Sequence, residues 1–450
     1  MSHRDSYERV RLNSCCLKLA LRWLLSGIRW SDIQFRKDCS WTPATLATAA
    51  LLWAWSDELT LIDRFQTIRN IVLHLSPQLQ PLAGSYQAFM KMLRRWSGPL
   101  VVLLQFRLRE QQQSELGDYW RVLGFAMFAV DGSRTELPRT TSNEQAYSST
   151  RKTSKRKPRT GHAKKSNSPQ LWLTTMWHVG SGLPWDWRLG PADSSERAHL
   201  LEMLPALPDA ALIAADAGFV GYKYAHAVLA SGRELLLRVG ANVKLLKKLG
   251  YACESEQTVY LWPDQQARHN QPPLVLRLVV AHGKHPVYLL TSVSRSQLSD
   301  AQVIELYGRR WGIELFYRHL KQTFQRRKLR STSADNARIE LEWSLVGLWA
   351  MALYAQVTRH QQALPPQQLS VAQALRAFRR LLRDYLHPTE RGQRLRDRLQ
   401  QANIDTYQRK SKQSRDYPRK KQETPPGAPQ IRPASASHRS QARALRQLTQ

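Results

Sequence analysis

The chain has few cysteines and no long hydrophobic run. Its four cysteines among 450 residues form no Cys-x-x-Cys pair, so we expect neither a disulfide framework nor a conventional zinc ribbon, and a reducing compartment fits. The longest apolar runs, Leu46–Trp55 and Leu345–Ala355, are shorter than the roughly 20 residues that a membrane span needs. The N-terminus is polar and shows no secretory signal. We therefore expect a cytoplasmic protein without membrane contact.

Acidic residues are also scarce. Asp and Glu total 35 against 67 Lys and Arg, which gives a formal net charge of +32. Such an excess favours a polyanionic partner, because cationic side chains displace the counterions condensed on phosphates. A hydrophobic content of 42% is enough to build folded cores, so the chain is not disordered overall. These features predict a nucleic-acid-associated protein of two or three folded units.

Local patterns divide the chain into five segments with different expected structures. We expect a helical N-terminal domain (1–118), a strand-rich α/β segment (119–235), a β-rich insertion (236–297), a helical segment (298–390) and a basic, largely disordered tail (391–450). Basic residues spread over the first helices indicate either a DNA-docking surface or ordinary solvated helix faces.

A polar stretch between expected strands is strongly basic. Residues 145–169 contain no acid, and their cations include Lys164 and Lys165. The stretch is either a solvated loop or a DNA-binding loop, and the absence of acids favours DNA.

Two acids follow apolar runs that are typical of buried strands. Asp131 comes after residues 122–130, and Asp216 comes after residues 210–215. The order strand, strand, strand, helix, strand over this region indicates an α/β domain with a mixed sheet, as in ribonuclease-H-like proteins. Either acid alone is commonly a turn or helix-cap residue.

A third acid lies in a helical pattern with a distinctive set of neighbours. If residues 307–321 form one helix, Tyr307, Arg310, Glu314 and Lys321 fall within about 60° of its circumference. Leu306, Ile313, Leu320 and Phe324 form an adjacent apolar stripe. An ordinary surface helix with i,i+4 ion pairs is the alternative. Trp311 could flank the set, but we expect it to pack against the protein.

Asp131, Asp216 and Glu314 together suggest a three-carboxylate site. Ligand sets made only of oxygen suit Mg²⁺ or Mn²⁺ better than zinc. Two such ions about 4 Å apart activate water and stabilise the leaving oxygen in phosphodiester cleavage.

These motifs resemble those of bacterial insertion-sequence DDE transposases, specifically the insertion-sequence-four family. The family signature is Tyr, two residues, Arg, three residues, Glu, six residues, Lys, and it is intact here from Tyr307 to Lys321. Asp216-Ala-Gly-Phe219 and Asp131-Gly-Ser-Arg134 are similar to its two Asp motifs. The resemblance spans about residues 120–360. It implies an α/β, ribonuclease-H-like catalytic core in two parts (119–235 and 298–390), interrupted by the insertion and preceded by an N-terminal DNA-binding domain.

The resemblance also implies roles for individual residues. Asp131, Asp216 and Glu314 would bind two Mg²⁺ ions, with Mn²⁺ as a substitute. Water would cut the terminal inverted repeat, and the freed 3′-hydroxyl would attack target DNA. The implied DNA contacts are Tyr307, Arg310, Arg318, Lys321, Lys164, Lys165 and Trp262. Trp262 is the candidate for holding a flipped base, but the residues themselves favour a strand-core position for it.

The expected partners are double-stranded DNA and, in the DNA complex, a second copy of the chain, because two element ends must be bridged. Association with the nucleoid follows from this partner. The main alternative is a decayed or domesticated DNA-binding protein of the same fold. An RNA-binding protein and a simple nuclease are further alternatives, but neither accounts for the complete signature.

Overall fold

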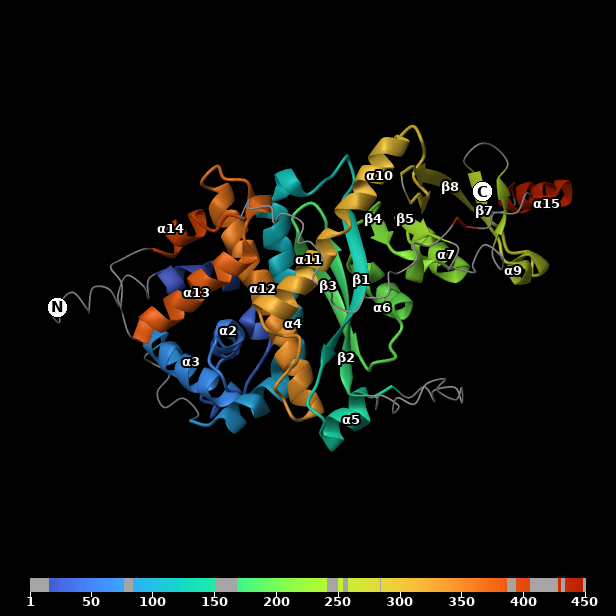
Figure 1. The fold of residues 1–450 in the computed structure, drawn as a ribbon. Helices are drawn as coiled ribbons and strands as arrows, with labels where there is room; N and C mark the ends of the chain where they lie inside the picture. The colour runs from blue at the N-terminus through green and yellow to red at the C-terminus, as the bar shows by residue number, and fades with distance from the viewer. Residues whose placement is uncertain are drawn as a thin grey trace, which may run out of the picture.

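The computed structural model has a helical half and a sheet half that lie side by side (Figure 1). It describes residues 16–76, 84–149, 168–240, 250–253, 258–283, 285–386, 394–404, 428–429 and 434–447. Within these ranges the strands form one nine-stranded sheet of order β3-β2-β1-β4-β5-β9-β8-β7-β6. No helix in the described part of the chain is long and apolar enough to cross a membrane.

The first five strands have the expected mixed pairing. They are β1 (Met127–Glu136), β2 (Gln170–His178), β3 (Leu183–Gly190), β4 (Leu212–Ala215) and β5 (Glu234–Val239). The first three pair antiparallel, whereas β4 pairs parallel to both β1 and β5. Helix α6 (Glu196–Met203) precedes β4, and α7 (Tyr222–Ala230) joins β4 to β5. The predicted order strand, strand, strand, helix, strand is therefore present.

Strand β1 differs from its prediction at both ends. The apolar run suggested a strand over residues 122–130 that stops before Asp131, but β1 begins at Met127 and continues to Glu136. Its first four residues are buried, and from Asp131 onward most residues are partly or fully exposed. The strand leaves the core at Asp131 while keeping its pairing with β2. The end of the apolar run therefore predicted the end of the buried part of β1 and not the end of the strand itself.

The region of the expected insertion extends the same sheet. Strands β6 (Gly250–Cys253), β7 (Thr258–Leu261), β8 (Leu274–Ala281) and β9 (Val287–Thr291) pair antiparallel, and short helix α9 (Asp264–Arg268) follows β7. Strand β9 pairs with β5, which itself pairs with β4. Although the prediction placed most of β5 in the insertion, β5 thus joins the first strands to the added ones.

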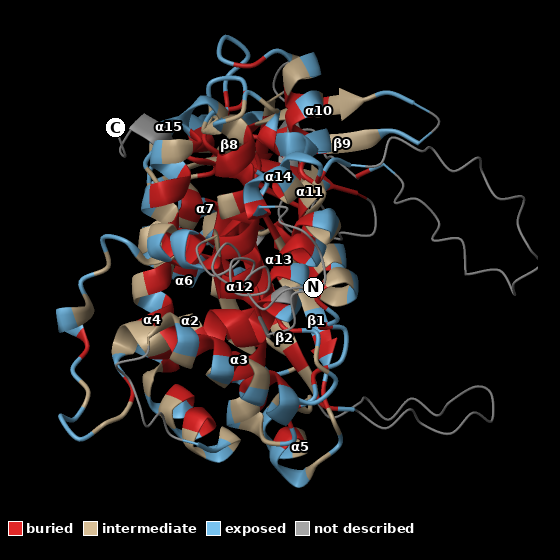
Figure 2. Ribbon diagram, turned by 90° about the vertical axis from the view of Figure 1, so that its left-hand side faces the viewer, coloured by how far each residue is buried: buried red, intermediate tan, exposed pale blue. Residues whose placement is uncertain are grey.

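The N-terminal helices share a hydrophobic core with a long helix from late in the chain. Besides a helix over residues 16–25, they are α2 (Pro43–Trp55), α3 (Leu61–Leu75) and α4 (Tyr86–Glu115). Helices α2 and α4 pack against α12 (Ala334–His360), which is buried along most of its length, and α3 packs against α2 (Figure 2).

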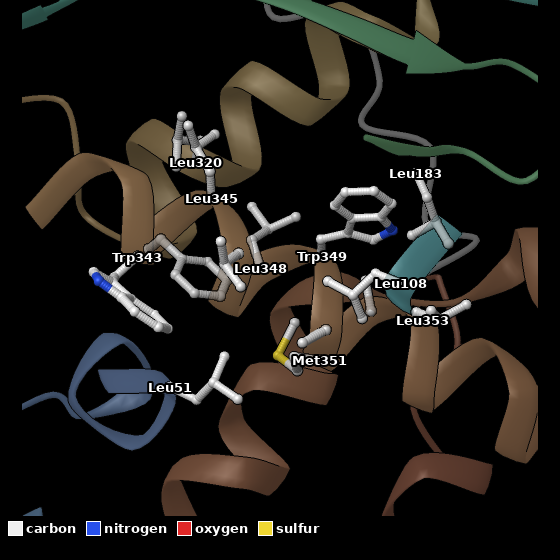
Figure 3. Close-up of a cluster of buried hydrophobic side chains, with 14 of the residues drawn as sticks. Leu51, Leu108, Leu183, Leu320, Trp343, Leu345, Leu348, Trp349, Met351 and Leu353 are labelled. Atoms are coloured by element: carbon white, nitrogen blue, oxygen red, sulfur yellow. The ribbon is translucent and has the colours of Figure 1, made fainter. Parts of the chain in front are cut away.

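Buried tryptophans connect these helices through hydrogen bonds. Trp55 Nε1 of α2 donates to the Gly347 carbonyl of α12 at 2.8 Å. In return, Trp343 and Trp349 of α12 donate to Ser97 Oγ and Gln112 Oε1 of α4, at 2.8 and 2.9 Å. Figure 3 shows Trp343 and Trp349 on α12 among leucines from several elements, including Leu51 and Leu108. Satisfied polar groups on large aromatic side chains fix the relative positions of α2, α4 and α12.

The signature segment is not the single regular helix that the spacing predicted. Helix α10 (Asp300–Arg309) is followed by α11 (Gly312–Arg318) and a π-helical turn (His319–Thr323). Between α10 and α11, backbone bonds run to the third preceding residue, as from Arg310 N to the Tyr307 carbonyl at 3.2 Å. The chain therefore tightens before Glu314 and widens after Arg318. The expected apolar stripe is nevertheless confirmed, because all four of its residues are buried.

The remaining helices are α5 (Thr141–Tyr147), α13 (Val371–Leu386), α14 (Leu395–Gln400) and α15 (Ala436–Gln447). Helices α14 and α15 contradict the prediction of disorder for those parts of 391–450. Helix α14 buries Leu395 and Leu399, and Gln441 of α15 donates to the Ala267 carbonyl at 3.4 Å. Average composition suggested a solvated tail, but a short helix needs only a few apolar positions to dock.

Candidate active site

Asp131 and Asp216 occupy equivalent positions, each directly after the stretch over which β1 and β4 pair in parallel. Val130 of β1 pairs with Ala215 of β4, so each aspartate directly follows a paired residue. Adjacent strands lie about 4.8 Å apart. Gly132 N–H donates to Asp131 Oδ1 and Gly218 N–H donates to Asp216 Oδ1, each at 2.8 Å. The two carboxylates are thus held near each other by backbone geometry.

Helix α11 brings Glu314 to the same region. The Tyr317 hydroxyl of α11 donates to the Asp131 carbonyl at 2.6 Å, which fastens the helix to β1. Gly312 begins α11 directly against the Trp177 ring of β2, and a Cβ atom there would overlap the ring. Because Gly312 has no side chain, α11 can approach the sheet. Glu314 lies in the first turn of α11 and is exposed.

The other signature residues surround these acids. Arg310 is only 5% exposed, and its Nη2 lies 3.8 Å from Glu314 Oε1. Its guanidinium also lies 5.3 Å from the centre of the Tyr307 ring, within the range of a cation–π contact. Arg310 and Lys321 both interact electrostatically with Asp131. Although the signature segment is not one regular helix, its residues still lie close to the two aspartates.

Electrostatics at Asp131 indicate a need for positive charge. Burial raises the pKa of Asp131 to about 6. The Gly132 N–H and Arg310 act in the opposite direction, whereas the charges of Asp216 and Glu314 raise the pKa further. Asp131 therefore interacts with both other predicted acids, and a bound cation would favour its ionised form.

The sequence prediction missed a fourth carboxylate, Glu196. Its Oε1 lies against Gly132, next to Asp131, and its Oε2 would lie 3.8 Å from a Cβ atom on Gly218. Burial raises the pKa of Glu196 to about 7, and the charges of Asp131 and Asp216 raise it further. Glu196 is the first residue of α6, whose N-cap Ser195 accepts a hydrogen bond from Ala198 N–H.

The side chains fit a divalent metal by chemistry, although they are not arranged as a closed metal site. Within the described ranges, no three Asp, Glu, His or Cys side chains converge closely enough to hold one ion as they stand. Every acid in the group offers only oxygen, as hard ions such as Mg²⁺ and Mn²⁺ prefer. The charges of Asp216 and Glu314 act on Asp131, and those of Asp131 and Asp216 act on Glu196, so the four carboxylates lie in one region of the molecule.

Residues 126–349 match the family model for the transposase DDE domain, and this span contains Asp131, Asp216 and Glu314. The chain belongs to the DDE transposase family. The transposase is also similar to the Escherichia coli (strain K12) protein "Transposase InsG for insertion sequence element IS4", with 27% identity over 273 residues. That alignment covers 58% of this chain and 59% of the relative, so the transposase spans less than two thirds of the relative's length.

Among solved structures, the transposase is similar to a cryo-EM structure of piggyBac transposase in a synaptic complex with hairpin DNA. The TM-score is 0.41 and the identity is 12%, with 89% of this chain and 88% of that chain covered. At this TM-score the two folds are only loosely alike.

The two candidate tryptophans of the transposase differ in exposure: Trp262 has the strand-core position given as its alternative, whereas Trp311 is more exposed than expected. Trp262 is 1% exposed, donates from Nε1 to the Gln271 carbonyl at 2.7 Å and lies 6.4 Å from the His438 ring of α15. It is a core residue and offers no face to DNA. Trp311, which we expected to pack, is 54% exposed beside Arg310. Arg318 is exposed on α11, whereas Lys164 and Lys165 lie outside the described residues.

Proposed function

We propose that this transposase cuts DNA at the terminal inverted repeats of its own insertion sequence and joins the freed 3′-hydroxyl to target DNA. The observation that carries the proposal is the pairing of Val130 with Ala215, which sets Asp131 beside Asp216. The Tyr317–Asp131 hydrogen bond, which ties the Glu314 helix to the same point, supports it. We infer that β1 to β5 with α10 and α11 form a ribonuclease-H-like catalytic core.

Asp131, Asp216 and Glu314 would hold the metal, and Glu196 is positioned to assist. A pair of Mg²⁺ or Mn²⁺ ions would supply activation of the attacking water or 3′-hydroxyl and stabilisation of the leaving oxygen. The three acids are held by different parts of the chain. Asp131 and Asp216 are fixed by glycine N–H groups, whereas exposed Glu314 enters from a helix.

Cationic and aromatic side chains would orient the DNA. The guanidinium of Arg310 lies near both the Tyr307 ring and Glu314, contacts that would orient it toward a phosphate bound at the acids. Lys321 adds a second positive charge near Asp131. Exposed Trp311 offers a flat surface on which a nucleobase displaced at the cut can stack.

Bridging two element ends requires two active sites, so we propose that the protein acts as a homodimer on double-stranded DNA. Its substrate is chromosomal DNA, which places the working protein in the cytoplasm at the nucleoid. The net charge of +32 supports strong attraction to DNA before any specific contact forms.

The test is a cleavage assay on a labelled duplex that carries the ends of the encoding element, with Mg²⁺, Mn²⁺ or EDTA. We expect metal-dependent nicking at the element boundary. Asp131→Asn, Asp216→Asn and Glu314→Gln should each abolish nicking while leaving end binding largely intact. Glu305→Gln is a matched control, because Glu305 is an α10 acid paired with Arg309 and not with the site.

Normal cleavage by any of the three site variants would remove that residue from the assignment. Tight binding without cutting in either metal would instead identify a decayed or domesticated DNA-binding protein of the same fold.

A further inference from the structure

A pocket with only basic and neutral lining lies between two C-terminal helices, apart from the carboxylates. It has a volume of about 530 Å³. Its polar lining, which we call the arginine pocket, consists of Gln373, Arg376, Arg380 and Arg383 of α13, Arg398 of α14 and the adjoining Gln401. No described Asp or Glu lines it. In Figure 1, α13 and α14 lie on the helical side of the molecule, and α11 and β1 lie closer to its centre.

The arginines of α13 are divided between two tasks. Arg379 points inward, where its Nε donates to the Trp55 carbonyl at 3.1 Å and supports packing against α2. Arg376, Arg380 and Arg383 are exposed and recur at helical spacing on one face, opposite buried Phe378. Like charges at this spacing repel one another, and these three exposed side chains lie outside the core that α13 forms with its neighbours.

The arginines of the pocket come from more than one helix. Arg383 lies 3.7 Å from Asp57, an ion pair that is largely open to solvent. Arg398 reaches the same pocket from α14, so positive charge converges from two separate helices. Guanidinium groups bind phosphate oxygens in a bidentate manner, and the amides of Gln373 and Gln401 can donate to further phosphate or sugar oxygens.

We propose that the arginine pocket binds the phosphate backbone of duplex DNA at a distance from the cut, independently of base sequence. The proposal rests on the proposed transposase function for the identity of the polyanion. Contacts to phosphates position DNA without reading its bases. The pocket therefore suits DNA that flanks the element end, or target DNA, rather than the inverted repeat itself.

The test compares two double variants of the full chain that remove equal charge. Arg376→Gln with Arg380→Gln alters the pocket, whereas Arg394→Gln with Arg396→Gln alters exposed arginines at α14 that do not line it. Affinity for a duplex without inverted repeats is measured in EDTA across a salt series. We expect the slope of log affinity against log salt to fall by about two for the pocket variant and to change little for the control.

Equal slopes for the two variants, or an unchanged slope for the pocket variant, would overturn the proposal. So would a pocket that binds pyrophosphate while its substitutions leave duplex affinity unaltered. Thermal melting checks that both variants fold like the wild type. Duplex binding is measured without metal, so a loss of binding can be told apart from a loss of cleavage. We expect the pocket variant to cleave a short end duplex normally.

Discussion

The Glu196 carboxylate rests directly on the backbone of Gly132. A Cβ atom on Gly132 would overlap Glu196 Oε1 and would lie 2.7 Å from Trp172 Cζ2. Gly132 is the residue whose N–H donates to Asp131, so the absence of a side chain there lets a fourth acid approach the first catalytic candidate. The site consequently depends on a glycine as much as on its acids.

Replacing Gly132 with alanine should therefore displace Glu196 and weaken the protein. Overpacking of this kind costs about 1–3 kcal/mol. We expect Gly132→Ala to lower the unfolding midpoint in urea and to reduce metal-dependent cleavage strongly. Adding Glu196→Ala should recover part of the lost stability but not the cleavage. If the two substitutions are additive in stability, the proposed contact between Gly132 and Glu196 is wrong.

Glu196→Gln should change how stability depends on pH. The raised pKa, about 7 against an ordinary 4.5, means that the folded protein holds a proton that the unfolded chain has released between these values. This group therefore reduces stability as pH rises from about 4.5 to 7. Neighbouring Asp131 and Asp216 strengthen the effect, while Arg134 and Arg197 weaken it.

In EDTA, the melting temperature of the Glu196→Gln variant should rise relative to that of the wild type as pH rises from 5 to 7.5. Adding Mn²⁺ should reverse this trend, since a cation favours the ionised glutamate. Glu202→Gln on the same helix is the control, because Glu202 is exposed and pairs with Arg188. Parallel melting curves for the wild type and the Glu196 variant across this range would contradict the prediction.

Trp311 and Trp262 should respond oppositely to replacement by alanine. Trp262 is buried, so Trp262→Ala should cost about 3–5 kcal/mol of unfolding free energy. Trp311 is half exposed, so Trp311→Ala should change stability little while weakening DNA cleavage if a base stacks on it. Chemical denaturation and the end-cleavage assay measure both effects. A stable Trp311→Ala variant that cleaves normally would remove Trp311 from the site.

The positions of Asp131 and Asp216 after buried strand segments, and the spacing of the signature set, could be predicted because they depend on local pattern. Continuous apolar runs and a repeated helical spacing are visible in the residues themselves, and the apolar stripe containing Ile313 and Leu320 is buried as expected. The predicted placement of Tyr307, Arg310, Glu314 and Lys321 assumed a regular α-helix with a constant 100° per residue, however. Gly308 and Gly312 favour a local change in helix type, and the bonds around Arg310 show that one occurs.

Glu196 and the exposure of Trp311 could not be assigned in this way. An acid in the first turn is favourable in almost any helix, so the position of Glu196 carried no signal for a site. Whether a tryptophan is buried depends on elements distant in sequence. Trp262 is adjacent to α15, more than a hundred residues later, and no local pattern shows that contact.

His178 provides a test of the join between the sheet and the helical half. Its ring is fully buried and stacks on Trp120 at 4.3 Å. Nε2 donates to the Trp120 carbonyl at 3.0 Å, so Nδ1 is the acceptor for the Ser181 N–H at 3.2 Å. Ser181 in turn accepts from Gln112 of α4 and, at its carbonyl, from Gln356 of α12. A neutral His178 thus holds the turn to which both helices bind.

Burial lowers the pKa of His178 from 6.5 to about 4, although the Trp120 carbonyl opposes the shift. Between pH 6.5 and 4, His178 therefore binds a proton in the unfolded chain but stays neutral in the folded protein. The stabilisation present above pH 6.5 is consequently lost as pH falls. Over this range of pH the loss amounts to roughly 3 kcal/mol of unfolding free energy.

His178→Gln can keep both kinds of hydrogen bond but cannot titrate, so its stability should fall less steeply below pH 6.5. Urea unfolding of the wild type, His178→Gln and the exposed-site control His226→Gln at pH 7, 5.5 and 4.5 measures this difference. Identical profiles for the wild type and His178→Gln would mean that protonation of His178 does not loosen the turn at Ser181.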